Sequence, residues 1–175
     1  MESHGERLGR GDKAAFAELY DDCAERVHHY LVSRLGSRVD ADDVLQETFV
    51  RLARDRKRLA NVQNLLPYVF ATARNEAHRL IEHRVREGRR RTELESVLVI
   101  VEDGRDQNKR EAAERVSVLL EGLDPPLREI VELKSFGALT FREISEVTGL
   151  PQGTVATRYR SALEKMRGQA VKEWE

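Results

Sequence analysis

Basic side chains gathered in two blocks are the residues of this sequence best suited to a chemical task, the binding of phosphate groups. From Arg74 to Arg91, seven arginines stand against three glutamates, and from Lys134 to Arg167 six bases stand against three acids. The segment between them, Glu93 to Glu132, has a net charge of −6. Two basic blocks separated by an acidic one indicate two phosphate-facing surfaces. Solvated helix faces would give the same pattern, so this alternative stays open.

The segment Thr140–Met166 has the spacing of a helix-turn-helix. Thr140 and Glu143 form the Thr-x-x-Glu pattern of a capping box, and Gly149-Leu150-Pro151 predicts a tight turn before a second helix. In this motif the second helix enters the DNA major groove. The inward positions of that helix are Val155, Tyr159, Ala162 and Met166, and its outward positions are Gln152, Thr157, Arg160, Ser161 and Glu164. A plain helical hairpin is the alternative.

Signs of catalysis or metal binding are missing from the sequence. We find no Gly-rich phosphate loop, no paired catalytic carboxylates and no nucleophile motif. Cys23, His28 and His29 share one expected helix, but their spacing is poor for joint ligation. A single cysteine also excludes an internal disulfide. We therefore expect no enzyme activity, no metal and no cofactor.

Helical periodicity runs through most of the chain and predicts an all-α fold. The first helix is expected to start at Asp12 and to end at Gly36, and the second to be capped by Asp40. A polar loop, Asp55–Asn64, follows. Asn64 is the expected cap of a third helix, whose pattern ends where the basic run Arg84–Arg91 begins. Their inward residues are Phe16, Leu19, Tyr20, Cys23, Val27, Tyr30 and Leu31, then Val44, Leu45, Phe49 and Leu52, then Val69, Phe70, Ala73, Ala77, Leu80 and Ile81.

The second half of the chain follows a segment without helical period, Glu93–Asp106, for whose apolar run Val97–Val101 the sequence offers no account. Helices are expected to resume near Asn108. We therefore predict two small helical modules, 1–92 and 112–175, joined by a linker at 93–111. No apolar stretch approaches the roughly 18–20 residues that cross a bilayer, so we expect a soluble, cytoplasmic protein without membrane insertion.

Two blocks of the sequence resemble one family, the extracytoplasmic-function (ECF) sigma factors of bacterial RNA polymerase. Leu123–Arg128, Leu139–Ile144, Gly153–Val155 and Arg158 are similar to region 4 of these proteins. Asp40–Arg51 looks like their region 2 signature, and Ala73–Asn75 fits the same region. The resemblance implies a region 2 helical bundle and a region 4 helix-turn-helix.

The resemblance also implies a role for the helix around residues 40–53, which in the family docks on a coiled coil of the largest polymerase subunit. The residues so implicated in polymerase binding are Asp40, Asp43, Gln46, Glu47 and Arg51. An acidic helix start that favours the macrodipole explains the aspartates equally well, but not the register of Gln46, Glu47 and Arg51.

DNA contacts are implied for both modules. Binding of the −10 promoter element is implied for Arg56, Lys57, Arg58, Asn61, Asn64, Arg74, Asn75 and Arg79. Binding of the −35 element is implied for Gln152, Thr154, Thr157, Arg158, Arg160 and Ser161. The family often has an acid where Arg79 stands, so the resemblance does not fix the role of Arg79. The family often has bases where Ala156 and Ser161 stand, so the upstream (−35) sequence preference of this chain is expected to be unusual.

The function implied is that of a sigma factor, which binds RNA polymerase core and directs promoter recognition, DNA melting and transcription initiation. Its partners would be core polymerase, promoter DNA and an anti-sigma factor, with the free protein a monomer. In the family the connector passes through the RNA exit path, which gives the acids of the linker a role. From the residues alone, a dimeric helix-turn-helix regulator and a helical adaptor without a DNA role stay open, and only the sigma factor requires core polymerase.

Overall fold

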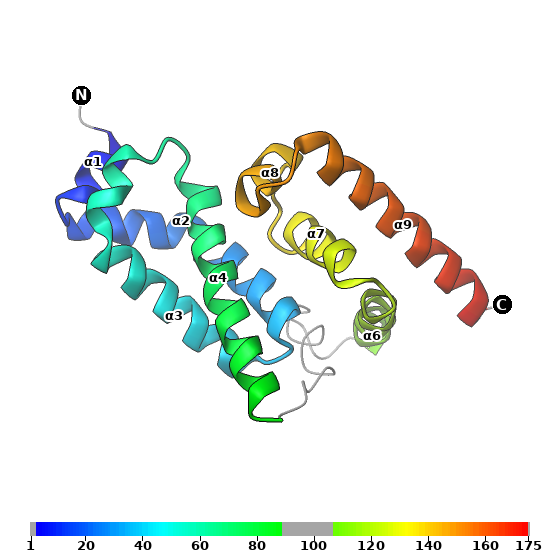
Figure 1. The fold of residues 1–175 in the computed structure, drawn as a ribbon. Coiled ribbons are helices and arrows are strands. Elements are labelled where there is room, and N and C mark those ends of the chain that lie inside the picture. Colours follow the sequence, from blue (N-terminus) through cyan, green and yellow to red (C-terminus); the bar gives the residue numbers. More distant parts are fainter. Residues whose placement is uncertain (1–2, 89–106, 175) are drawn as a thin grey trace.

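The computed structural model describes residues 3–88 and 107–174, and every regular element within these two ranges is a helix (Figure 1). The all-α expectation is therefore confirmed. In chain order the elements are α1 (His4–Gly9), α2 (Lys13–Leu35), α3 (Arg38–Arg54), the 3-10 helix η1 (Arg56–Asn61), α4 (Leu65–Arg86), α6 (Gln107–Glu121), α7 (Pro125–Ser135), α8 (Phe141–Thr148) and α9 (Gln152–Trp174). The segment Glu93–Asp106, with Val97–Val101, lies outside the described residues, whereas α6 already begins at Gln107.

The helix ends show where local sequence signals held and where they failed. Asp12 caps α2 by accepting hydrogen bonds from the amides of Ala14 and Ala15, and Gly36 ends α2 in the left-handed conformation at φ 68°. The prediction that Asp40 caps the next helix was wrong. Ser37 has the extended backbone that a cap needs, and its hydroxyl accepts from the Asp40 amide.

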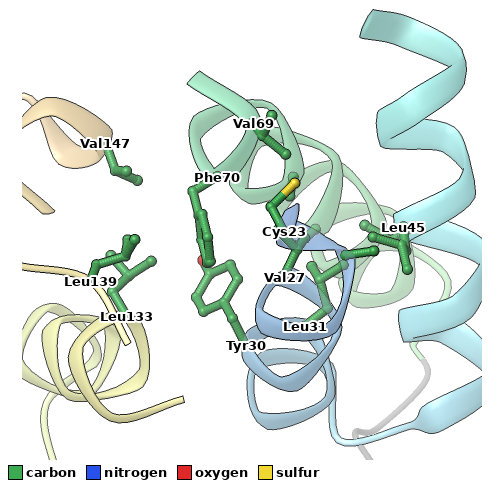
Figure 2. Packing of buried hydrophobic residues seen from close by; sticks show 14 of the residues in the cluster. Cys23, Val27, Tyr30, Leu31, Leu45, Val69, Phe70, Leu133, Leu139 and Val147 are labelled. Atoms are coloured by element: carbon green, nitrogen blue, oxygen red, sulfur yellow. The ribbon is translucent and has the colours of Figure 1, made fainter. Parts of the chain in front are cut away.

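The N-terminal module (the described residues from 3 to 88) has its core between α2, α3 and α4. Leu31 and Val27 of α2 pack toward Leu45 of α3 and Val69 of α4 (Figure 2). Tyr20 was expected to point inward, but its side chain is 45% exposed, because it covers Phe49 at the outer rim of α2 and α3.

Three features of this module differ from or add to the expectation. The short helix α1 was not predicted at all. The polar loop contains the 3-10 helix η1, and α4 continues to Arg86 instead of ending at residue 84. Asn64 occupies the N-cap position of α4 as expected, although its side chain makes no capping hydrogen bond.

The C-terminal module (residues 107–174) contains the expected helix-turn-helix. Thr140 and Glu143 form a reciprocal capping box at the start of α8, and Gly149 ends that helix at φ 74°. Val155 and Ala162 of α9 are fully buried. The predicted caps, turn and inward residues are thus confirmed.

The two modules pack directly against each other, which the sequence did not predict. The ring of Phe70 on α4 lies 5.8 Å from that of Tyr30, and Leu133 and Leu139 of the C-terminal module lie next to these rings (Figure 2). Gly137 sits so close to the Phe70 ring that a Cβ there would come within 2.9 Å of it. A single hydrophobic core therefore extends from α2 and α4 into α7 and α8.

No helix in the part of the chain that the structure describes is both long and apolar enough to cross a membrane.

Candidate nucleic-acid interface

The outer face of α3 presents three of the five residues expected to bind a protein partner. Asp43, Gln46 and Glu47 are exposed and point away from the core. The other two are held inside the module instead. Asp40 pairs with Arg84 of α4 at 2.5 Å, and the Arg51 guanidinium lies 2.8 Å from a carboxylate oxygen of Glu76.

An apolar groove runs beside this face of α3. It encloses about 620 Å³ between α2 and α3, and Gln46 lies at its edge. Its apolar lining includes Phe16, Tyr20, Leu45, Phe49 and Val50. Exposed apolar side chains next to patterned polar ones are typical of a protein-binding surface.

The basic loop, Asp55–Asn64, holds its cations in solvent. Arg56, Lys57 and Arg58 are exposed, and within the described residues none of them forms an ion pair. Leu59 is 1% exposed and anchors the loop to the module. Asn61 and Asn64 are exposed as well. The loop therefore has the free positive charge that phosphate binding requires.

A small cavity lies between the basic loop and α4, and we name it the loop–α4 cavity. It encloses about 170 Å³, and its lining is Arg51, Leu52, Asp55, Arg58, Leu59, Tyr68, Thr72, Asn75 and Glu76. The cavity brings Arg58 from the loop side and Asn75 from the helix side to one place. Tyr68 and Thr72 were missed in the sequence, although they lie seven and three residues before Asn75, a spacing that places all three on one face of a helix.

Arg74, the first cation expected on the helix side, is engaged by the other module. Its Nε lies 2.6 Å from Oε1 of Glu129 on α7, and its Nη2 lies 3.1 Å from Oε2. Burial alone would raise the pKa of Glu129, but hydrogen bonds from His78 and Arg74 lower that pKa to about 2. Glu129 is thus a buried anion held by Arg74 and His78 of α4. No sequence signal could identify this pairing, because it depends on how the modules pack.

Arg79 and Arg51 both meet Glu76. The Arg79 Nη1 lies 3.1 Å from the Glu76 carboxylate, and the Arg79 side chain stays 56% exposed. Glu76 itself is 8% exposed and borders the loop–α4 cavity. Arg79 can therefore keep its ion pair with Glu76 while its side chain still faces solvent.

The exposed side of α9 carries the residues expected to read DNA. Gln152, Thr157 and Arg160 are exposed, while Thr154, Arg158 and Ser161 are half-buried. Arg160 makes only a long contact of 3.4 Å to the Ala156 carbonyl. The inner side is fixed by Tyr159, whose ring meets the Phe141 ring of α8 edge-on at 5.4 Å. The packing of α8 on α9 thus leaves Arg160 free to point outward.

Cys23 and the two adjacent histidines do not form a metal site. Cys23 is 2% exposed, its thiol donates to the Leu19 carbonyl, and burial raises its pKa to about 12. His28 pairs with Asp42 at 2.8 Å. Among the residues that the structure describes, no cluster of three or more His, Cys, Asp or Glu side chains could hold a metal ion.

Known proteins resemble both modules. Residues 19–87 match the family model of Sigma-70 region 2, and residues 113–166 match that of Sigma-70, region 4. RNA polymerase sigma factor CarQ of Myxococcus xanthus is 26% identical over 93% of this chain and 92% of its own length. ECF RNA polymerase sigma factor RpoE of Cereibacter sphaeroides is 27% identical over 89% of this chain and 86% of its own length.

A solved structure has the same arrangement of helices. CnrH, in complex with the cytosolic domain of CnrY, superposes with a TM-score of 0.75 and covers 97% of this chain and 96% of that chain. At 20% identity this likeness concerns the fold alone. Two family models in the expected order and full-length relatives lead to one conclusion: the chain belongs to the sigma-70 family of RNA polymerase sigma factors and is of the ECF type.

Proposed function

We propose that this protein is the promoter-specificity subunit of a bacterial RNA polymerase, with its two modules reading the two promoter elements separately. The sigma factor family gives the general role, which is binding to core polymerase and initiation of transcription at a promoter. The assignment of tasks to particular residues rests on the geometry of the surfaces described above. The protein then acts in the cytoplasm, where polymerase and promoters are found.

The polymerase would dock on α3. Asp43, Gln46 and Glu47 offer polar contacts, and the apolar groove between α2 and α3 offers buried area beside them. Asp40 and Arg51 act differently from what the sequence indicated, because their ion pairs with α4 brace the docking helix from behind.

The basic loop and α4 would hold the opened −10 strand. Opening a duplex is stabilised when an extruded base enters a pocket and the phosphates follow a cationic track. The observation that carries this proposal is the loop–α4 cavity of about 170 Å³, which joins Arg58 to Asn75 and is lined by the aromatic ring of Tyr68. We assign Arg56, Lys57 and Arg58 to the phosphates and Tyr68, Thr72 and Asn75 to the base.

Arg74 could join the −10 contacts only after the modules separate. In the structure its guanidinium is occupied by Glu129 of α7, and α4 packs against α8. Promoter phosphate and Glu129 would then compete for the same cation. Asn64 lies next to α8 as well, in a cleft of about 690 Å³ that Arg142 and Glu143 also line.

The recognition helix α9 would read the −35 element in the major groove. Its N-terminal half points Gln152, Thr157 and Arg160 outward, and an arginine in this position can bind guanine through two hydrogen bonds. Arg158 is half-buried and suits a phosphate contact better than a base contact.

Reconstitution with core polymerase tests the proposal. The protein should co-elute with core enzyme in gel filtration, be monomeric alone, and direct transcription from a promoter selected out of a random library. A free protein that binds a palindromic site as a dimer without core enzyme would contradict the proposal. An anti-sigma partner, which we also propose, would be expected to compete with core polymerase for the α3 surface.

A further inference from the structure

The short helix α1 lies directly on the basic loop, with its backbone in contact with the backbone of η1. A Cβ added to Gly5 would lie 2.7 Å from the carbonyl oxygen of Leu59, and one added to Gly9 would lie 2.9 Å from the Cβ of Ala60. Both distances are too short for side chains, so α1 can approach the loop this closely only because these two positions are glycine. The two residues are one helical turn apart and face the same neighbour.

The helix α1 is fixed to the module independently of the loop. Leu8 is fully buried in the core, and Ser3 and Glu6 form a reciprocal capping box. Arg7 binds Glu18 of α2 through two hydrogen bonds, of 2.9 and 3.1 Å, and also binds Asp12 at 2.8 Å. A helix of six residues is unstable alone, so these contacts are what give it a defined position.

The cations of the loop rest on the same helix and on the turn after it. Gly11 has a φ of 83°, and a Cβ there would meet Nε of Arg56 at 3.1 Å. Lys57 lines a shallow depression together with Glu6, Gly9 and Ala60. The stem of Lys57 is therefore positioned by α1 and that of Arg56 by the turn after α1, while both residues are exposed.

The loop reaches the core through Leu59, which is fully buried, and through Val62, which is partly buried against the same core. Gly5 lies against the carbonyl group of Leu59, and Leu59 also lines the loop–α4 cavity. A displacement of η1 relative to α1 therefore also moves part of the wall of this cavity.

We propose that α1 is a positioning element for promoter melting: through Gly5 and Gly9 it sets the height of the basic loop over α4, and with it the shape of the cavity that takes the extruded base. This inference rests on the −10 role proposed for the loop. It assigns a specificity-determining function to a segment that precedes the matched family region, which starts at residue 19.

The exchange of one methyl group between α1 and the loop tests this proposal. Gly9→Ala should push against Ala60, whereas Ala60→Gly removes the atom it would meet, so the double variant should recover. In reconstituted polymerase, Gly9→Ala should lower discrimination among −10 bases and permanganate reactivity of the opened strand several-fold. Binding to core enzyme and the upstream footprint should stay within about twofold of the original protein, and Gly9→Ala with Ala60→Gly should restore −10 discrimination.

Matched variants separate positioning from general damage. Gly168→Ala adds the same methyl group to α9, where no atom lies within 4 Å, and should change nothing. Gly5→Ala meets a backbone oxygen, so Ala60→Gly should not rescue it. If Gly9→Ala folds poorly, Ala60→Val approaches the same contact from the exposed loop side and should give the same loss of discrimination.

Two results would overturn the proposal. One is unchanged −10 discrimination in both Gly9→Ala and Ala60→Val, and the other is a defect that Ala60→Gly does not repair. If Arg56, Lys57 and Arg58 can be neutralised together without effect on the −10 element, the role of the loop itself fails. If that neutralisation matters and Gly9→Ala does not, the loop assignment stands and only the role of α1 is lost.

Discussion

Arg74 and Glu129 are 55 positions apart in the chain, and their side chains form a two-point ion pair that joins α4 to α7. The Arg74 side chain is 24% exposed and that of Glu129 is 11% exposed, so the pair is largely removed from solvent. Arg34 of α2 forms an ion pair with Glu132, which lies on α7 like Glu129. Arg26 of α2 donates hydrogen bonds to the carbonyls of Gly137 and Ala138. Basic side chains of one module thus hold acceptors of the other at three points.

Removal of the Glu129 charge should weaken the contact between the modules. Loss of one partner leaves a half-buried guanidinium without its anion, so Glu129→Gln should lower the free energy of unfolding by about 2–3 kcal/mol. It should also release Arg74 for the promoter and increase the fraction of open complexes. Urea denaturation and permanganate footprinting measure the two effects.

The same ion pair can be broken from its other side. Arg74→Gln should destabilise the free protein by a similar amount, but it should decrease promoter opening, because the cation itself is lost. If Glu129→Gln and Arg74→Gln change promoter opening in the same direction, Glu129 and promoter phosphate do not compete for Arg74.

Glu129 also predicts how stability depends on pH. Its pKa is lowered from an ordinary 4.5 to about 2, despite burial that opposes the shift, by hydrogen bonds from His78 and Arg74. A carboxyl with a lowered pKa contributes stability above its unfolded-state pKa, and this contribution is lost as the pH falls from about 4.5 toward 2. The loss should reach roughly 3 kcal/mol.

Chemical denaturation between pH 6 and pH 3 measures this dependence. Asp12 and Glu18 also have lowered pKa values, chiefly through Arg7. The relevant quantity is therefore the difference in the free energy of unfolding between the original protein and Glu129→Gln. That difference should shrink as the pH falls. A difference that stays constant over this range would show that Glu129 is not the group responsible.

The outer face of α3 gives a prediction about polymerase binding. Gln46→Ala combined with Glu47→Lys should weaken the affinity for core polymerase at least tenfold, since like charges placed together at an interface cost several kcal/mol. Both residues are exposed, so circular dichroism and thermal unfolding should be unchanged. Glu114→Lys, an equally exposed charge reversal on α6, is the matched control and should bind core normally. Equal affinities of the two variants would remove α3 from the interface.

Local signals in the sequence predicted local structure well. Asp12, Gly36 and the Thr140–Glu143 capping box each act within one helical turn, and all three were confirmed. The prediction for Asp40 also relied on a local signal, but it failed. Ser37 and Asp40 are both residue types that cap helices well, and only the backbone geometry decides between them. The helix α1 was missed because six residues with two glycines show no apolar periodicity.

Long-range relationships could not be predicted. Helix periodicity and charge predicted most of the surface residues of α9 and of the basic loop. Gln152, Thr157 and Arg160 are exposed, as are the loop cations, whereas Ser161, also expected to point outward, is half-buried. That Arg74 meets Glu129, or that Arg51 meets Glu76, depends on packing between different helices. The pair of Arg79 with Glu76 is different, because the two residues are three positions apart on α4. The sequence therefore predicts which cations the chain offers, but not which of them the free protein already uses.

Arg160 and the basic loop lie in different modules, so their loss should affect different promoter elements. Arg160 is exposed on α9, and its neighbour Tyr159 faces inward against Phe141. A two-point contact from arginine to guanine discriminates by about 1–3 kcal/mol. Arg160→Ala should therefore weaken promoter binding and relax the preference at one or two upstream base pairs, as selection from a promoter library would measure. Arg167→Ala, which removes an exposed charge from the same helix farther from the turn, should leave that preference intact.

Neutralisation of the basic loop should weaken contacts to the opened −10 strand and leave the upstream base preference unchanged. Replacement of Arg56, Lys57 and Arg58 by glutamine should reduce retention of the opened strand and the salt dependence of binding, because fewer phosphates are neutralised. The upstream base preference should not change, since α9 is untouched. If Arg160→Ala leaves the upstream preference as it was, the reading contact must lie elsewhere on the exposed face of α9. Thr157 and Gln152 would then be the residues to replace, because both are exposed on that face.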